Sequence, residues 1–227
     1  MKAAVTEDAL RQDLLCRNMY DQSKIAFMEH LRSGRAERNP YWENSVALMV
    51  VHLTTGALES FINAVLHLAE YWRQPRHCPV AADDLVRLVD KREDTIEKWK
   101  WLGRRASKGA WFDKSKEPMV SYVALVTLRN DLADHDKAPI LRESEGWKNE
   151  RRRHLVDKDL THERAAMAIV TVTRMVASLR QAFLAGDPDC LLAADSGWKL
   201  VWQWAHVIEP EILVLAGLPK EPLAAWQ

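Results

Sequence analysis

Apolar residues recur along most of this chain at intervals of three and four, the spacing at which side chains share one face of a helix. The clearest such segment begins at Asn39-Pro40, a cap residue followed by the residue favoured at the first helical position, and runs to about Arg73. Its apolar stripe consists of Val51, Leu58, Val65 and Trp72, flanked by Ala47, Phe61 and Leu68. We expect this helix to form the centre of the core.

Similar patterns predict helices on both sides of this one. In chain order they run from Thr6 to Ser33-Gly34, from Asp83-Asp84 to about Leu102, from Glu117-Pro118 to a stop by Pro139, and from Asp159 or Thr161 to Gly186. The expected core face of the helix from Thr6 consists of Leu10, Leu14, Leu15, Met19, Ile25, Met28 and Leu31. That of the helix from Glu117-Pro118 includes Leu125, Leu128 and Leu132. That of the helix ending at Gly186 consists of Ala165, Ala168, Ile169, Val172, Met175, Val176, Leu179 and Phe183.

Composition favours the same fold class. Glycine and proline are scarce, at 8 and 9 of 227 residues, which favours helices over a turn-rich β-sandwich. The expected fold is all-α, an up-and-down bundle of about five to six helices. A helix in 1–36 would pack on a bundle formed by 37–186, and a C-terminal helical extension would occupy 187–227. This extension carries Trp198, Trp202 and Trp204, which would pack on the domain or be buried in a dimer interface.

Charge and cysteine usage limit the partners and the compartment. Thirty-two basic residues balance thirty-two acidic ones, so any contact with RNA must be local. Cys16, Cys78 and Cys190 are far apart and odd in number, which favours a reducing compartment over a disulfide framework. No apolar run reaches membrane-spanning length, and the first residues lack the long apolar core of a signal peptide. We therefore expect a soluble, cytoplasmic protein without membrane contact.

The central helix also carries a partly polar stripe beside its apolar one. This stripe consists of His52, Gly56, Glu59, Asn63 and His67. It is either a solvated edge of the helix or part of a functional surface. A metal site is not expected, because His52 and His67 would lie about 22 Å apart along the helix.

The stretch from Leu128 to Asp136 concentrates residues suited to chemistry. Arg129, Asn130 and His135 fall within two helical turns behind an apolar run. Arginine binds phosphate through its planar fork of donors, and histidine transfers protons near neutral pH. His135 would lie near a helix C-terminus and four residues after Asp131, two features that are expected to raise its pKa.

Two basic runs are further candidates for RNA contact. One is a short loop bounded by Gly103 and Gly109, and the other lies in the charged connection 142–157. Their basic residues are Arg104, Arg105 and Lys108 in the first, and Arg151, Arg152 and Arg153 in the second. A solvated loop is the alternative interpretation of both runs.

Two of these motifs together resemble the HEPN superfamily (higher eukaryote and prokaryote nucleotide-binding domains), over roughly residues 40–185. The first is Gly56-Ala57-Leu58-Glu59-Ser60-Phe61-Ile62-Asn63, similar to the Ala-Leu-Glu followed by Asn on the first core helix of stand-alone members. The second is Leu128-Arg129-Asn130 through His135, which resembles the Arg, polar residue, spacer, His signature of the ribonuclease members. Five residues separate Arg129 from His135, within the family's range although four are commonest.

This resemblance implies a bundle of four to five helices and metal-independent endoribonuclease activity, with an active site formed across a homodimer. Arg129 would bind phosphate, His135 would move protons, and Asn130 would orient phosphate or imidazole. Glu59 and Asn63 would support Arg129. No metal or cofactor is implied.

Two readings of these residues remain open. In the first, the protein cleaves RNA, with a toxin or phage-defence role and an antitoxin or other defence-system protein as a partner. In the second, it is a non-catalytic dimerisation module or a module that binds RNA or a partner, in which Arg129 pairs with Glu59 within the core and His135 only caps its helix.

Overall fold

The computed structural model describes residues 2–33, 40–71, 94–107, 113, 115–133, 160–186 and 208–219. These residues form helices and no strands, which confirms the predicted all-α class. The helices are α1 (Lys2–Ser33), α2 (Pro40–Tyr71), α4 (Thr95–Ala106), α5 (Met119–Ala133), α7 (His162–Gly186) and α9 (Pro210–Leu215).

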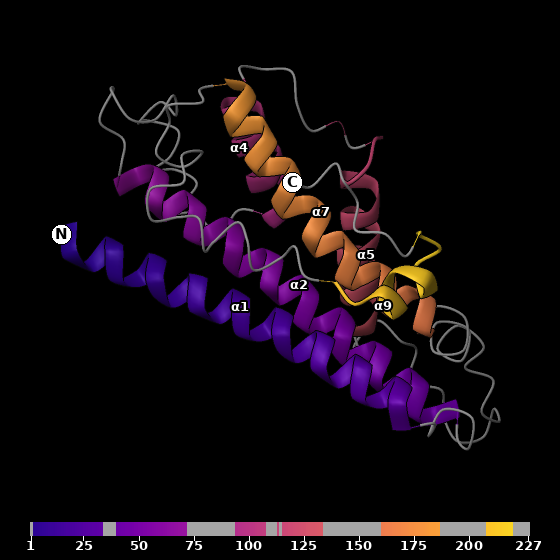
Figure 1. Ribbon diagram of the computed structural model, residues 1–227. Coiled ribbons are helices and arrows are strands. Elements are labelled where there is room, and N and C mark those ends of the chain that lie inside the picture. The colour runs from indigo at the N-terminus through magenta and orange to yellow at the C-terminus, as the bar shows by residue number, and fades with distance from the viewer. Residues whose placement is uncertain are drawn as a thin grey trace, which may run out of the picture.

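Two long helices, α1 and α2, lie side by side and run in opposite directions (Figure 1). The helix α7 packs on α2 and also contacts α4, α5 and α9, so the shorter helices gather around one α2–α7 pair. Buried side chains from all six helices belong to a single hydrophobic cluster. The short helix α9 joins this cluster through Ile212 and Leu213, which places part of the predicted C-terminal extension on the bundle.

Several helix ends lie where local signals in the sequence put them. Pro40 is the first residue of α2, and a cis Glu117–Pro118 bond directly precedes α5. The hydroxyl of Thr161 accepts a hydrogen bond from the Arg164 amide, 3.3 Å away, and so caps α7. These ends are encoded locally, because the cap or proline acts on groups within one turn.

The helix expected from Asp83 to Leu102 is interrupted at Asp94 and ends later than predicted. Asp94 has non-helical backbone angles, and its carboxylate accepts a hydrogen bond of 3.0 Å from the Ile96 amide, so α4 begins at Thr95. Residues 72–93 lie outside the described ranges. At the other end α4 continues to Ala106. The predicted basic loop therefore begins as the last turn of a helix.

The buried face of α1 matches the predicted one only in part, since Met28 is buried and Met19 and Leu31 pack against the core. Leu14 and Ile25 are 61% and 49% exposed and Leu15 is exposed too, while Met28 is buried. The fully buried residues are Cys16, Tyr20, Ser23 and Phe27, again at intervals of three and four. The Tyr20 hydroxyl lies 2.9 Å from that of Thr173 on α7. The rings of Tyr20 and Phe27 determine which face of α1 is buried, because they bury more apolar area than the leucines would and the tyrosine hydroxyl has a polar partner.

The predicted stripe of α2 is confirmed where it is described. Val51, Leu58 and Val65, with Ala47 and Phe61, are fully buried, whereas the side chains of Leu68 and Trp72 lie outside the described part. The predicted core residues of α7 are all buried as well. The sequence thus identified the two central elements of the core.

Two helices are long and apolar enough to match a membrane span by composition alone. They are Ser45–His67 of α2 and His162–Gly186, with mean hydropathies of 1.5 and 1.2 over an 18-residue window. The expectation that no apolar run reaches this length was therefore too strict. In the fold, 56% and 61% of these windows are buried, as in the core helices of a bundle.

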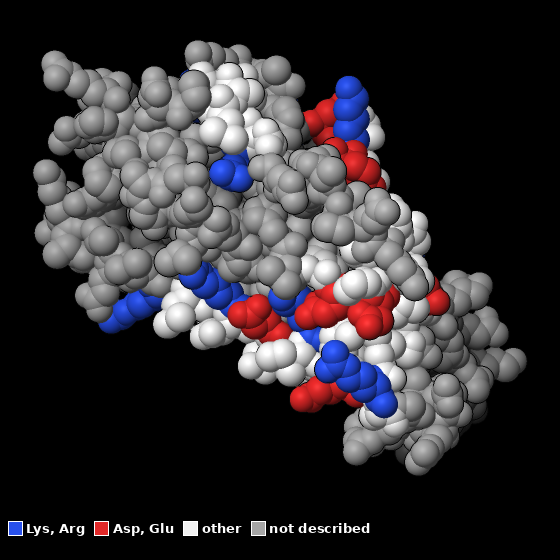
Figure 2. Space-filling model, in the orientation of Figure 1, with Lys and Arg blue, Asp and Glu red and all other residues white. Residues whose placement is uncertain are grey.

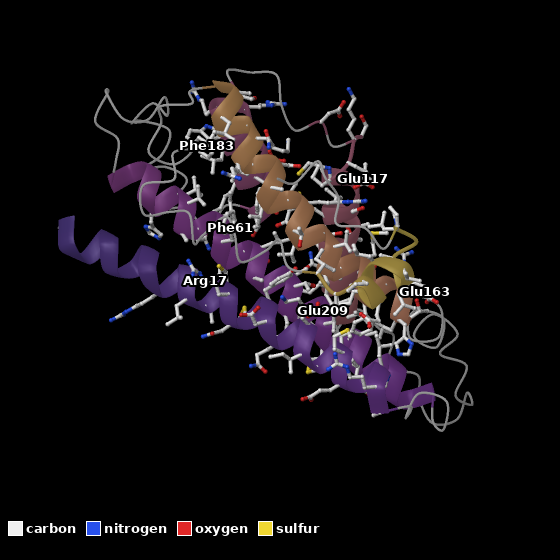
Figure 3. All side chains as sticks on the ribbon, in the orientation of Figure 1. Arg17, Phe61, Glu117, Glu163, Phe183 and Glu209 are labelled. Carbon is white, nitrogen blue, oxygen red and sulfur yellow. The ribbon has the colours of Figure 1, made fainter. Side chains whose placement is uncertain are left out.

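A histidine pair joins the end of α1 to the start of α7. The Nε2 atoms of His30 and His162 are 2.9 Å apart, and the ring of Phe27 meets that of His162 edge-on. Figure 3 marks Glu163, next to this pair in the sequence, and Phe183 near the other end of α7. The pair therefore lies at one end of the bundle.

Candidate functional site

The candidate site is built around an ion pair between α5 and α2. Nη2 of Arg129 donates a hydrogen bond to Oε1 of Glu59, a residue 70 positions earlier in the chain. The two side chains are 28% and 30% exposed. Arg129 is thus oriented by a carboxylate, while part of its surface stays open to solvent.

The packing of α5 on α2 decides what else lies near Arg129. Tyr122, two turns before Arg129 on α5, packs edge-on against Trp99, and Trp99 stacks on Phe61 of α2. Arg129 itself bonds Glu59, closer to the start of α2. The end of α5 therefore lies toward the N-terminal half of α2, where the next polar side chain of the stripe is that of His52.

Electrostatics agree with this placement of His52. Partial burial, and then the positive charge of Arg129, lower the pKa of His52 below its ordinary value. The His52 side chain is exposed at the surface. An exposed imidazole that favours the neutral form thus lies within the electric field of a partly exposed guanidinium.

A buried phenol closes the inner side of this cluster. Burial, and then the charge of Glu59, raise the pKa of the Tyr122 hydroxyl well above its usual range. Tyr122 therefore stays protonated, and the charged groups of the cluster are Glu59 and Arg129. Sequence reasoning missed Tyr122, because an aromatic residue inside an apolar run carries no sign of polar neighbours.

Asn63 does not support Arg129 as expected. Its Oδ1 accepts a hydrogen bond of 2.9 Å from Nζ of Lys98, because α4 passes this part of α2 where the prediction placed the arginine. Lys98 is largely buried at this contact. The polar stripe of α2 thus meets α5 at Glu59 and α4 at Asn63.

The remaining candidate residues fall into two groups. Asn130 and Asp131 are exposed on α5, next to Arg129, and Arg104 and Arg105 are exposed on the last turn of α4. His135, Lys108, Arg151, Arg152 and Arg153 lie outside the described residues. The lysine that meets Asn63 is in the first turn of α4, and Arg104 lies about 9 Å further along that helix, near Ala106, which meets Gly186 at the end of α7.

The face shown in Figure 2 carries charges of both signs. Along the edge formed by α1, basic and acidic side chains alternate. The exposed charged residues of α1 include Arg11, Asp21, Glu29 and Arg32. This edge is therefore an unfavourable surface for a polyanion such as RNA.

The other side of α5 faces α7 across a mainly apolar groove of about 260 Å³. Leu125 and Leu128 line it from α5, and Met167 and Ala168 line it from α7. Of the stripe predicted for α5, Leu125 is buried, whereas Leu128 and Leu132 are half-buried. The apolar stripe thus packs α5 on α7, and Arg129 on the other side of α5 contacts α2.

Taken together, these residues can bind an oxyanion and exchange a proton. A guanidinium held on one side by a carboxylate offers donors to a phosphate, and a neutral imidazole beside it can accept a proton. Within the described ranges, no three His, Cys, Asp or Glu side chains come together as ligands of a metal ion would.

The chain was compared with models of protein families, with curated proteins and with solved structures. None of these three comparisons found a match.

Proposed function

We propose that this protein is an endoribonuclease of the HEPN type, which cleaves RNA without a metal ion and uses Arg129 to bind the reacting phosphate. The observation that carries this proposal is the state of Arg129. Its guanidinium is oriented by Glu59 and its side chain is 28% exposed, so the arginine is fixed and partly accessible. Fixed cationic donors are what a phosphate requires where negative charge builds up during the reaction.

The reaction would proceed by attack of the 2′-hydroxyl on the neighbouring phosphate. It needs a base for the hydroxyl proton, an acid for the leaving 5′-oxygen, and positive charge on the phosphorus centre. In a homodimer with two-fold symmetry each active residue is present twice, so Arg129 and His135 of both subunits would serve one cleft. Asn130 would orient the phosphate.

The biological role proposed is that of a cytoplasmic toxin or phage-defence effector, controlled by an antitoxin or other defence-system protein. It is drawn from analogy with stand-alone HEPN proteins, because a fold supports many functions. RNA is the substrate class that the arginine and histidine chemistry serves.

The test is cleavage of purified tRNA or total RNA in the presence of EDTA. We expect the wild-type protein to release fragments that end in a 2′,3′-cyclic phosphate, and Arg129→Ala and His135→Ala to lose this activity. Arg32→Ala, which changes an exposed arginine on α1, is the matched control and should remain active. Equal cleavage by the wild type and both site variants would eliminate the proposal.

One observation favours a second function, a dimerisation or RNA- and partner-binding module without catalysis. The charge of Arg129 is balanced by Glu59, as in an ion pair that only holds two helices together. This alternative predicts a stable dimer, or retention of RNA, without cyclic-phosphate products. Sedimentation of the protein at micromolar concentration, combined with the cleavage assay, separates the two.

A further inference from the structure

The strongest unassigned feature of the site is His52. It lies seven residues before Glu59 on α2, and positions seven apart share one face of a helix. Glu59 holds the guanidinium of Arg129, and α5 runs from Tyr122 at the level of Phe61 toward the part of α2 that carries His52. The structure thus gathers a carboxylate, a guanidinium and an imidazole on one partly exposed surface between two helices.

We propose that His52 is a catalytic residue of this surface and acts as the general base that activates the 2′-hydroxyl of RNA. This inference rests on the proposed function, and adds to it a residue outside the Arg129 to His135 motif. Three observations support it: His52 is exposed, it shares a helix face with the carboxylate that orients Arg129, and it lies on the part of α2 toward which α5 extends.

The protonation state of His52 suits this role. A general base must be unprotonated at the working pH, and burial together with Arg129 lowers the pKa of His52 from its ordinary value of about 6.5. Arg129 is the charged neighbour that acts on the imidazole. The same guanidinium would therefore bind the phosphate and keep the base free of its proton.

The proposed step forms one bond at phosphorus, breaks another and moves two protons. His52 takes the proton of the 2′-hydroxyl while the 2′-oxygen bonds to phosphorus, and the bond between phosphorus and the 5′-oxygen breaks. The leaving 5′-oxygen receives a proton from the acid of the proposed reaction. The products are a 2′,3′-cyclic phosphate and a 5′-hydroxyl, and exchange of protons with water restores base and acid.

The test compares His52→Gln with His67→Gln in single-turnover cleavage of RNA with EDTA. His67 is a matched control, because it lies on the same stripe of α2 but about 22 Å further along the helix. We expect His52→Gln to lower the rate about 100-fold or more, the usual contribution of a general base, and His67→Gln to leave it unchanged.

Two readouts distinguish a base from a residue that only shapes the surface. The wild-type rate should fall as the pH drops through the lowered pKa of His52, because the base becomes protonated, and this acid limb should be absent in His52→Gln. Added imidazole should partly restore cleavage by His52→Ala. Circular dichroism should show that both variants fold, since the side chain is exposed.

The outcomes separate the two proposals. If the wild type cleaves RNA and Arg129→Ala does not, while His52→Gln matches His67→Gln, the inference is wrong and the proposed function stands. If His52→Gln is slow but keeps the acid limb and His52→Ala gains nothing from imidazole, His52 is not the base. If the wild type itself releases no cyclic-phosphate fragments, the proposed function fails, and the role of His52 fails with it.

Discussion

Arg129 on α5 and Glu59 on α2 form an ion pair that joins two helices across 70 residues of sequence. Both side chains are about 30% exposed, so solvent screens part of their attraction. We expect Glu59→Gln to lower the free energy of unfolding by about 1 kcal/mol, because Arg129 loses its charged partner at a half-buried site.

Urea denaturation at pH 7 measures this loss. The matched control is Glu97→Gln, which removes a pair formed within α4 with Lys100 at 2.8 Å, and should cost at most about 0.5 kcal/mol. Equal losses in the two variants would mean that the link between α5 and α2 contributes no more than an ordinary surface pair.

The second prediction concerns the titration of His52. Because the charge of Arg129 disfavours the protonated imidazole, Arg129→Gln should raise the pKa of His52 toward its ordinary value of about 6.5. Burial, the larger cause, would keep the pKa from reaching that value. Proton NMR of the imidazole C–H resonances measures the shift, and Arg104→Gln should leave the titration unchanged.

The sign of the linked effect on stability follows from the same shift. The pKa of His52 is lower in the folded chain than in the unfolded chain, so the unfolded state binds the proton more readily. The contribution of His52 to stability is therefore complete above about pH 6.5 and is lost as the pH falls through the folded pKa. Relative to the wild type, His52→Gln should lose less stability on acidification over this window; an identical pH dependence would contradict the shift.

The third prediction compares two helical glycines. A Cβ on Gly186 would lie 1.7 Å from the carbonyl oxygen of Ala106, so α7 and α4 are packed too closely for any side chain there. A Cβ on Gly56 would instead meet the flexible end of Met19, with its sulfur 2.9 Å away. We expect Gly186→Ala to destabilise the fold by about 3 kcal/mol, because the backbones of two helices must separate.

Gly56→Ala is the control for this pair. Methionine can move aside, and alanine favours a helix over glycine by about 1 kcal/mol, so this variant should be near neutral or slightly more stable. Thermal unfolding followed by circular dichroism measures the stability of both variants. A Gly186→Ala protein as stable as the wild type would show that α4 and α7 are not in such close contact.

The fourth prediction concerns the pair of His30 and His162. Replacing either residue by leucine removes one side of a part-buried hydrogen bond of 2.9 Å, at a cost of about 1–3 kcal/mol. The double variant should lose less than the sum of the single losses, by about 1 kcal/mol. Chemical denaturation of the four proteins gives this coupling, and strictly additive losses would rule out a direct interaction between the two rings.

The sequence predicted the central elements because their signals are local. Pro40 and Thr161 mark the starts of α2 and α7, and the repeat of Val51, Leu58 and Val65 identifies a buried face. It also predicted that Glu59 and Arg129 belong together, although only by resemblance to a family. His135 and the Trp-rich stretch lie outside the described residues, so those predictions still stand as predictions.

Other features depended on which elements meet. The sequence of α1 offers two apolar faces, and α2 and α7 select the one with Tyr20 and Phe27. Asn63 was expected beside Arg129, but α4 brings Lys98 to it instead. His52 belongs to the candidate site only because α5 extends toward the part of α2 that carries this residue.

The amino-acid sequence by itself therefore determined the helical class and most helix ends, because helix hydrogen bonds and caps join residues within a turn of one another. Only the tertiary structure decided which side chains share a surface, because contacts such as that of Arg129 with Glu59 depend on how whole helices pack.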